Sequence, residues 1–253
     1  METRYWEFSL FFPRELLCYF EELKTELKLL FSDKKCCVTT SVFEDKYVFM
    51  IALEKETYMQ YILQIKQKIA DIILIFYKPK TIDSAIKNFD LQRHDNVILL
   101  DILSNFDAYA DKKFIVQNLS LCDKLHIDSF VNFRLVCLTN RWKEIGHLIN
   151  KNSLFLMDEN VKRELMRFLM EGIETNIDFA KLSLVNSKIC VDCSCGSFVP
   201  KKLYYSLFDY DNMLFALISQ NPKQIEVSDY QSFDVNFVQN LSDLFGSKLI
   251  LKD

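Results

Sequence analysis

The clearest pattern in the chain is a stripe of apolar residues between residues 127 and 149. Its members recur at steps of 4, 4, 3, 4, 3 and 4, the spacing that places side chains on one face of an α-helix. They are Ile127, Val131, Leu135, Leu138, Trp142, Ile145 and Ile149. A shorter stripe follows, made of Val161, Leu165, Phe168 and Leu169. Asp158 is suited to cap the start of this second segment and Gly172 lies near its end, so the pattern predicts two antiparallel helices joined by a short polar loop.

The first 54 residues predict a small α+β unit. Residues 5–10 alternate loosely, as a strand does, and residues 16–30 carry leucine and phenylalanine at helical steps of 4, 3, 4 and 3. Two β-rich runs, 36–43 and 46–53, flank the polar pair Glu44-Asp45. The unit therefore reads as strand, helix and β-hairpin.

Residues 55–175 predict a mostly helical body. An apolar stripe from Tyr58 to Phe76 marks a long helix, which we expect to end at Pro79 because proline lacks the backbone N–H that the helix needs. Residues 81–120 are apolar but irregular and fit two or three shorter helices. The antiparallel pair described above completes this body.

Residues 176–253 predict a C-terminal α/β unit. Runs 179–185 and 188–193 alternate as a β-hairpin does, and 203–208 suits another strand. A helix N-capped by Asp211 is expected next. A strand at 224–228, a helix from Asp234 to Phe245 that stops at Gly246, and a last strand then make a βαβ unit with its two strands parallel. The fold class is therefore α+β, with domains 1–54, 55–175 and 176–253 that can also pack as one.

Composition narrows the functions that this fold can serve. The chain has 253 residues but only 4 glycines, far apart, which excludes the glycine-rich phosphate loops of dinucleotide- and nucleotide-binding proteins. A net charge of −4 argues against nucleic acid and against an anionic membrane as partners, although a small basic patch stays open. No segment reads as a signal peptide or a membrane span, so the 8 cysteines are expected to be reduced thiols in the cytoplasm.

Three stretches resemble the YtxC-like family of sporulation proteins from spore-forming bacteria. Residues 125–135 are similar to the family's leucine-histidine-acidic run followed by phenylalanine and a Phe-Arg-Leu triplet, and residues 163–170 and 211–225 are similar to two of its helices. The resemblance covers about residues 120–253. Ser129 stands where a glycine is usual and residues 152–160 replace an acidic, tyrosine-bearing segment, so the chain resembles a divergent member. The resemblance implies a cytoplasmic, sporulation-associated protein and no particular reaction.

Cys190, Cys193 and Cys195 form the sharpest chemical motif. Three thiolates this close can ligate zinc or an iron–sulfur cluster, but a tetrahedral site needs a fourth ligand from elsewhere in the chain. On a strand, Cys193 and Cys195 share a face that Cys190 does not. Free thiols are the favoured interpretation, and no cofactor is predicted.

The segment around Arg134 is a candidate interaction or structural motif. It comprises His126, Phe130, Phe133 and Arg134. Arg134 can extend a basic strip that includes Arg141, Lys143 and Lys151, or pair with a carboxylate at the rim of the core, which we favour given the acidic net charge. His126 is expected to pack or hydrogen-bond rather than act as a base.

Two hypotheses of function follow. The first is a non-enzymatic protein-interaction or scaffold role, because no catalytic grouping is visible and the 22 phenylalanines and 11 tyrosines exceed what a core needs. The alternative is a small-ligand-binding protein or enzyme with a pocket between the helical body and the C-terminal unit. Protein partners are expected, and homo-oligomers stay open.

Overall fold

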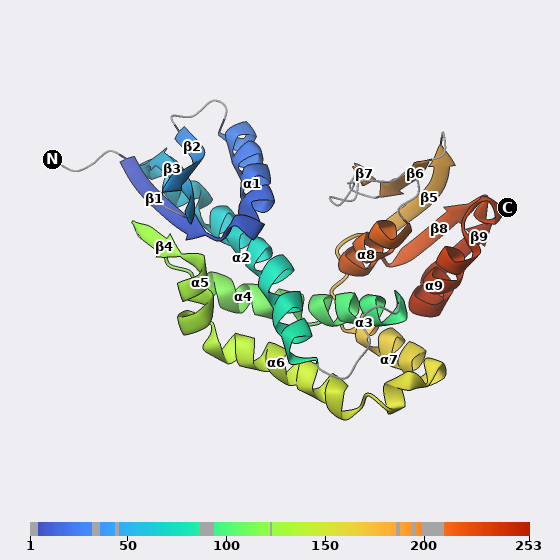
Figure 1. Cartoon of the computed structure of the whole chain (residues 1–253). Coiled ribbons are helices and arrows are strands. Elements are labelled where there is room, and N and C mark those ends of the chain that lie inside the picture. Colours follow the sequence, from blue (N-terminus) through green and yellow to red (C-terminus); the bar gives the residue numbers. More distant parts are fainter. Residues whose placement is uncertain are drawn as a thin grey trace. The chain divides into compact units, whose positions relative to one another are not determined.

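The computed structural model describes residues 5–31, 36–43, 46–86, 94–121, 123–185, 188–193, 196–198 and 210–253. The fold is α+β: an N-terminal strand, helix and hairpin, a mostly helical middle, and a C-terminal β-hairpin and βαβ unit, as the pattern predicted (Figure 1). The chain divides into two compact units. Unit 1 is Met1–Ala85 with Tyr109–Glu144, and unit 2 is Ile86–Ala108 with Ile145–Asp253. The predicted domains 1–54, 55–175 and 176–253 have other boundaries than these two units. They stay a prediction about which segments fold as domains.

Unit 1 contains a four-stranded sheet in the order β2-β3-β1-β4. Its strands are β1 (Tyr5–Phe12), β2 (Cys36–Phe43), β3 (Lys46–Glu54) and β4 (Lys124–His126). The hairpin β2–β3 is antiparallel as predicted, and β1 pairs antiparallel with β3. Strand β4 adds to β1 in parallel and was not predicted. Three residues are too few to show alternation, and the partner strand lies more than a hundred residues away in sequence.

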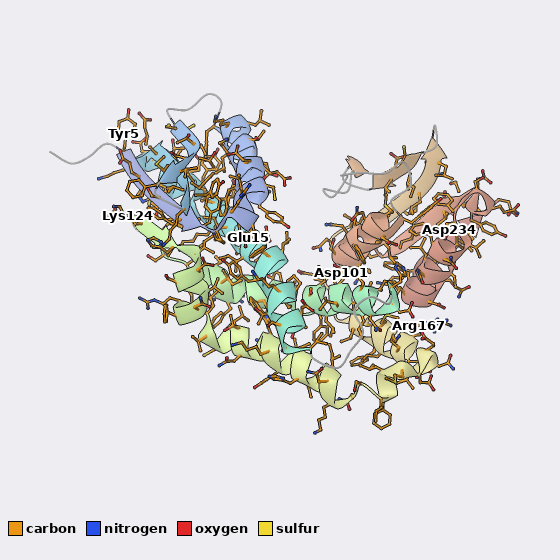
Figure 2. The ribbon with its side chains drawn as sticks, viewed as in Figure 1. Tyr5, Glu15, Asp101, Lys124, Arg167 and Asp234 are labelled. Carbon is orange, nitrogen blue, oxygen red and sulfur yellow. The ribbon has the colours of Figure 1, made fainter. Side chains whose placement is uncertain are left out.

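The core of unit 1 lies between this sheet and helix α1 (Leu17–Leu30), which follows the 3-10 turn η1 (Arg14–Leu16). Alternate residues of β1, namely Phe8, Leu10 and Phe12, are buried. The ring of Phe20 in α1 packs with its centroid 4.3 Å from that of Phe12 and 5.3 Å from that of Phe49. Side chains of the strands and the helix fill the space between them (Figure 2).

Helix α2 (Lys55–Ala85) does not end at Pro79, as the sequence pattern predicted, but continues for six more residues. Proline costs the helix one hydrogen bond. Beyond it, Ile82 is fully buried and Ala85 nearly so. Burial of this apolar turn offsets the lost bond, because burying an aliphatic side chain such as isoleucine is worth about 1.5–3 kcal/mol.

The long apolar stripe at 127–149 is buried as predicted, with Ile145 half-buried. The segment is not one regular helix, however. Short α5 (Ile127–Ser129) leads into a π-helical turn, η2 (Phe130–Arg134), and then into α6 (Val136–Lys151). The Leu135 N–H donates to the Phe130 carbonyl oxygen at 3.2 Å. This wider turn keeps residues four apart on one face, which matches the two successive steps of four in the sequence.

Unit 2 contains a five-stranded sheet in the order β7-β6-β5-β8-β9. Its strands are β5 (Phe179–Val185), β6 (Lys188–Cys193), β7 (Gly196–Phe198), β8 (Gln224–Ser228) and β9 (Leu249–Lys252). The β5–β6 hairpin and the parallel pair β8–β9 match the prediction. The parallel pairing of β5 with β8 was not foreseen. The strand predicted at 203–208 lies outside the described residues.

Four helices of unit 2 pack against one another. They are α3 (His94–Asn105), α7 (Glu159–Glu171), α8 (Tyr210–Gln220) and α9 (Val235–Phe245), with the 3-10 turn η3 (Phe155–Met157) before α7. Asp158 caps α7, as predicted, and Asp234 caps α9; each side chain accepts hydrogen bonds from two backbone N–H groups of its helix. Asp211 does not cap α8, because that helix begins one residue earlier, at Tyr210.

Helix α7 buries a different face from the one that its apolar stripe predicted. The buried residues are Lys162, Met166, Leu169 and Met170. Val161 and Phe168, two members of the predicted stripe, are exposed. The reason is that α7 packs mainly against α9 and α3, and those neighbours select the face that turns inward.

Candidate functional site

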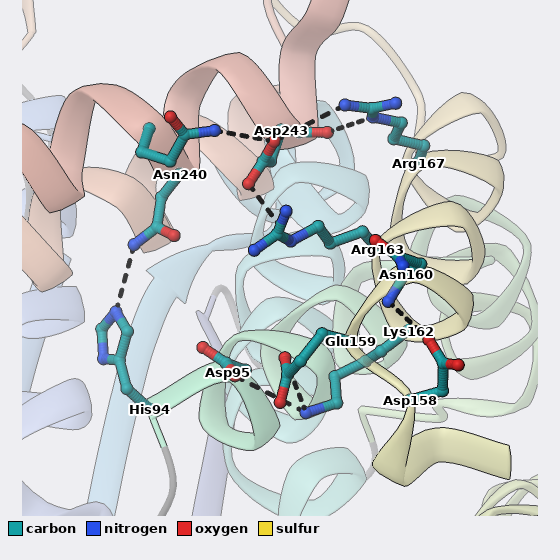
Figure 3. A network of polar contacts seen from close by, with 11 residues as sticks. His94, Asp95, Asp158, Glu159, Asn160, Lys162, Arg163, Arg167, Asn240 and Asp243 are labelled. Carbon is teal, nitrogen blue, oxygen red and sulfur yellow. Dashed lines mark hydrogen bonds and ion pairs between the residues drawn. The ribbon is translucent and has the colours of Figure 1, made fainter.

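A cleft of about 750 Å³ opens within unit 2 between α3, α7, α8 and α9. Its floor is apolar and buried, and consists of Ile98, Met166, Leu214, Phe237 and Leu244. Its rim is polar, with charged side chains contributed by all four helices. Figure 3 shows those of α3, α7 and α9. The cleft thus combines an apolar base with directional polar groups, the composition typical of ligand sites.

On one side of the cleft, two arginines of α7 converge on Asp243 of α9. The Arg163 Nε lies 3.4 Å from one carboxylate oxygen of Asp243, and the Arg167 guanidinium lies 3.6 Å from the other. Arg167 also donates to the Asp243 carbonyl oxygen. Asp243 is the least exposed member of the group, so these contacts fasten α7 to α9 (Figure 3).

At the opposite side, His94 begins α3 and faces α8 and α9. Its Nε2 lies 3.3 Å from the amide nitrogen of Asn240 and 3.7 Å from a carboxylate oxygen of Asp211. A neutral ring can accept a hydrogen bond from Asn240 through Nε2, whereas a protonated ring can pair with Asp211. His94 of α3 therefore lies beside polar groups of both α8 and α9.

Beneath the rim lies a buried lysine. The side chain of Lys162 is only 1% exposed, and its ammonium is 3.6 Å from the carboxylates of both Asp95 and Glu159. A buried charge needs such partners, because an isolated ammonium in an apolar interior is strongly unfavourable. Lys162 thus joins the first turn of α7 to α3 and reduces the negative charge of the rim.

The described lining of the cleft is rich in carboxylates. Carboxylates dominate the lining, namely Asp95, Glu159, Asp211, Asp234 and Asp243, and among the described residues it contains no serine, threonine or cysteine. A serine, threonine or cysteine nucleophile is therefore not present in the described lining. The carboxyl groups whose pKa is lowered, Glu21 and Glu226, lie elsewhere, and each is held by hydrogen bonds from lysine.

A second feature of unit 2 is an exposed apolar surface, which we call the apolar corner. It comprises Leu154, Phe155 and Met157 in the turn around η3, with Val161 and Phe168 on α7. Phe155 is 69% exposed and Phe168 67%. The turn directly precedes α7 and contacts it, so Leu154, Phe155 and Met157 lie beside the start of the helix that carries Val161 and Phe168. Grouped exposed apolar residues of this size mark interaction sites more often than single ones do.

The motif predicted around Arg134 is divided by the structure. Phe130 is buried in the core of unit 1, whereas Phe133 is 78% exposed and Arg134 is exposed at the end of the π-helical turn. The His126 ring stacks on that of Phe11, with centroids 4.4 Å apart. Among the described residues no carboxylate forms an ion pair with Arg134, so the favoured pairing at the core rim is not observed there.

The cysteine motif lies at the limit of the described residues. Cys190 is half-buried on β6, the backbone of Cys193 ends that strand, and Cys195 falls outside the described residues. Where side chains are described, no three His, Cys, Asp or Glu residues are arranged to hold a metal ion. Metal binding by the three cysteines therefore stays a prediction.

The alternative hypothesis expected a pocket between residues 55–175 and the C-terminal unit, and the cleft lies between α3 and α7 of that range and α8 and α9 of the C-terminal unit. Sequence reasoning did not identify the residues that line the cleft, and it did not find the apolar corner. The segment joining α6 to α7 was expected to be a polar loop. It begins with polar residues but continues with the apolar residues Leu154, Phe155 and Met157, which are exposed. This apolar run is the feature of the sequence from which the apolar corner could have been predicted. The lining residues of the cleft had no such signal, because Arg163, Asp211 and Asp243 come from separate helices and meet only in the fold.

Comparison with protein-family models, with curated proteins and with solved structures finds no match for the chain. Within the residues that the structure describes, no helix combines the length and apolar character needed to cross a bilayer.

Proposed function

We propose that the protein is a non-enzymatic protein-interaction or scaffold protein that binds a partner through the apolar corner. The observation that carries the proposal is the exposure of Leu154, Phe155, Met157 and Phe168 in one region of unit 2. Covering a leucine, methionine or phenylalanine side chain contributes about 1.5–3 kcal/mol. A partner that covers several of them gains enough to offset much of the entropy lost on association.

The association with sporulation, and with it the cytoplasm of a spore-forming bacterium, rests on the resemblance to the YtxC-like family. That resemblance is carried by residues 125–135, 163–170 and 211–225. Two of the three stretches belong to unit 2, and one of them lies within α7 beside the apolar corner. The resemblance therefore directs the search for a partner to sporulating cells.

A comparative pull-down from sporulating cells tests this proposal. The full chain and the triple variant Phe155→Ser, Met157→Ser, Phe168→Ser are used as baits, with quantitative mass spectrometry of the captured proteins. Val235→Ser is the matched control, because Val235 is 81% exposed in the same unit but lies on α9. We expect specific proteins to be lost from the triple variant and retained by the control. Identical captures with all three baits would contradict the proposal.

The cleft favours the alternative, a protein that binds a small ligand. Its volume of about 750 Å³ lies in the range of small-molecule sites, roughly 300–1,000 Å³. Thermal-shift screening of the full chain against metabolite mixtures tests this role. A ligand of the cleft must raise the melting temperature of the wild type and lose that effect in Asp211→Asn. A ligand that stabilises both proteins equally would be bound elsewhere.

A further inference from the structure

Helix α7 presents a second apolar stripe to solvent. Val161, Leu165 and Phe168 recur at steps of 4 and 3, the spacing of the a and d positions of a coiled-coil heptad. Val161 and Phe168 are exposed and Leu165 is half-buried. The face toward α3 and α9 is already filled by Met166, Leu169 and others. We call the solvent-facing stripe the α7 seam; it has the apolar spacing of one side of a helix–helix interface.

One border of this seam is acidic. With Phe168 at position d, Glu164 and Glu171 both fall at position g, and both are exposed. Glu164 forms no ion pair with a described residue. The arginines of α7, Arg163 and Arg167, pair with Asp243 of α9. In coiled coils the charges at g and e select the partner, and glutamate selects lysine or arginine.

The carboxylate of Glu171 interacts electrostatically with the ammonium of Lys248. That ammonium donates a hydrogen bond to the Asn221 side-chain oxygen at 2.8 Å. Lys248 is itself partly buried and committed to Asn221. The border of the seam therefore carries negative charge that a cationic partner can bind, above all at Glu164.

We propose that the α7 seam binds an amphipathic helix of a partner protein whose apolar stripe is flanked by lysine or arginine. The inference rests on the proposed function and names the partner class of the same surface. The apolar side chains of that helix would cover Val161, Leu165 and Phe168, and its cations would face Glu164 and Glu171. The turn that carries Leu154, Phe155 and Met157 extends the apolar surface beyond the start of α7.

A second copy of the chain is a poorer occupant. Two antiparallel seams place the glutamate borders of both copies against each other, which is repulsive. Two parallel seams place each glutamate border against position e of the other copy, where Lys162 and Leu169 are already buried in unit 2. Neither arrangement neutralises Glu164.

Two designed peptides test the inference directly. Each is a helix of about three heptads with leucine at a and d; one carries lysine and the other glutamate at e and g. Binding to the full chain is measured by fluorescence anisotropy. We expect the lysine peptide to bind about tenfold more tightly than the glutamate peptide, since attractive and repulsive surface pairs differ by this order. The preference should shrink in high salt.

Charge reversal provides the matched comparison. The double variant Glu164→Lys, Glu171→Lys should reverse the preference toward the glutamate peptide. The control Glu56→Lys, Glu144→Lys changes net charge equally at exposed positions on other helices and should leave the preference intact. Circular dichroism of each variant establishes that it is folded. An equal change in the control would show that only net charge matters and would overturn the inference.

A seam variant separates the two proposals. Val161→Ser with Phe168→Ser should weaken both peptides at least tenfold, whereas Val235→Ser should not. If the wild type binds both peptides equally and the seam variant binds neither, the surface is a docking site but its charge assignment is wrong. If no variant changes binding and the pull-down is also unaffected, both proposals are wrong. Concentration-dependent dimers that Phe168→Ser abolishes, seen by sedimentation, would assign the seam to a second copy and overturn the inference.

Discussion

Asp111 lies at the centre of a buried polar group in unit 1. Its carboxylate accepts a hydrogen bond from the Trp142 indole at 2.9 Å and pairs with the Lys78 ammonium at 2.8 Å. The side chains of Asp111 and Lys78 are each 1% exposed. Such a pair contributes little over an apolar replacement, but removing one partner leaves the other buried without its counter-ion.

We expect Asp111→Ala to destabilise the protein by about 3–5 kcal/mol, the usual effect of breaking a buried ion pair. The control is Asp71→Ala, since Asp71 pairs with Lys112 at the surface and should cost less than about 1 kcal/mol. Urea unfolding followed by tryptophan fluorescence measures both. Equal effects of the two substitutions would show that burial does not set the strength of the Lys78–Asp111 pair.

Glu226 gives the stability of unit 2 a dependence on pH. Hydrogen bonds from Lys181 and then Lys252, at 2.8 and 2.5 Å, lower the pKa of its carboxyl from 4.5 to about 2. The three residues belong to the neighbouring strands β5, β8 and β9. A depressed pKa means that the folded state prefers the charged form. The resulting stabilisation is present above pH 4.5 and is lost as the pH falls toward 2.

Glu226→Gln should therefore make unfolding less sensitive to acid. At neutral pH the variant should be less stable than the wild type, and the difference should shrink as the pH falls from 4.5 toward 2. Urea midpoints measured across that interval test this. A constant difference at every pH would mean that Glu226 does not titrate with the depressed pKa.

At the scale of elements, α7 has two apolar stripes, and only one of them is buried. Leu169 and Phe168 are adjacent in sequence and were both assigned to the stripe that faces the core. In the fold Leu169 is buried, whereas Phe168 is exposed. We expect Leu169→Ala to cost about 2–5 kcal/mol because it removes buried atoms, and Phe168→Ala to change stability by less than about 0.5 kcal/mol.

Thermal and urea unfolding of these two variants test which stripe of α7 packs inward. The comparison is informative because the substitutions are neighbours on one helix and both introduce the same residue. A larger loss from Phe168→Ala would show that the outward stripe is buried in solution, which would also weaken the proposed docking surface.

For the whole molecule, the division into two compact units predicts that local destabilisation stays local. Leu169→Ala should raise amide hydrogen exchange in β5, β8 and α9 of unit 2 while leaving β1 and β3 of unit 1 protected. Native-state exchange with mass spectrometry measures this. A uniform rise across both units would mean that the chain unfolds as a single cooperative unit.

Much of the secondary structure was predictable because it depends on local periodicity. The buried stripe from Ile127 to Ile149, the β2–β3 hairpin and the strand at 224–228 all follow from spacing alone. Continuation of α2 past Pro79 was not predictable, because the cost of the proline is local whereas the gain comes from burial of Ile82 in the fold. Strand β4 was missed for the same reason, since its stabilising partner, β1, is remote in sequence.

The candidate site was less accessible to sequence. Phe130, Phe133 and Arg134 could be singled out as a motif, but the structure buries the first and exposes the other two. Arg163, Asp243, His94 and Asp211 carry no shared pattern, because four separate helices bring them together. The spacing of residues within one helix or strand could be interpreted from the sequence, whereas the meeting of residues from different helices could not.

By itself the sequence determined the α+β class, most helices and strands, and the absence of a glycine-rich phosphate loop. These follow from interactions between residues close together in the chain, or from composition. Only the tertiary structure decided which of the two stripes of α7 is buried and which side chains line the cleft. An amphipathic helix can pack through any sufficiently apolar face, and the choice belongs to its neighbours in space.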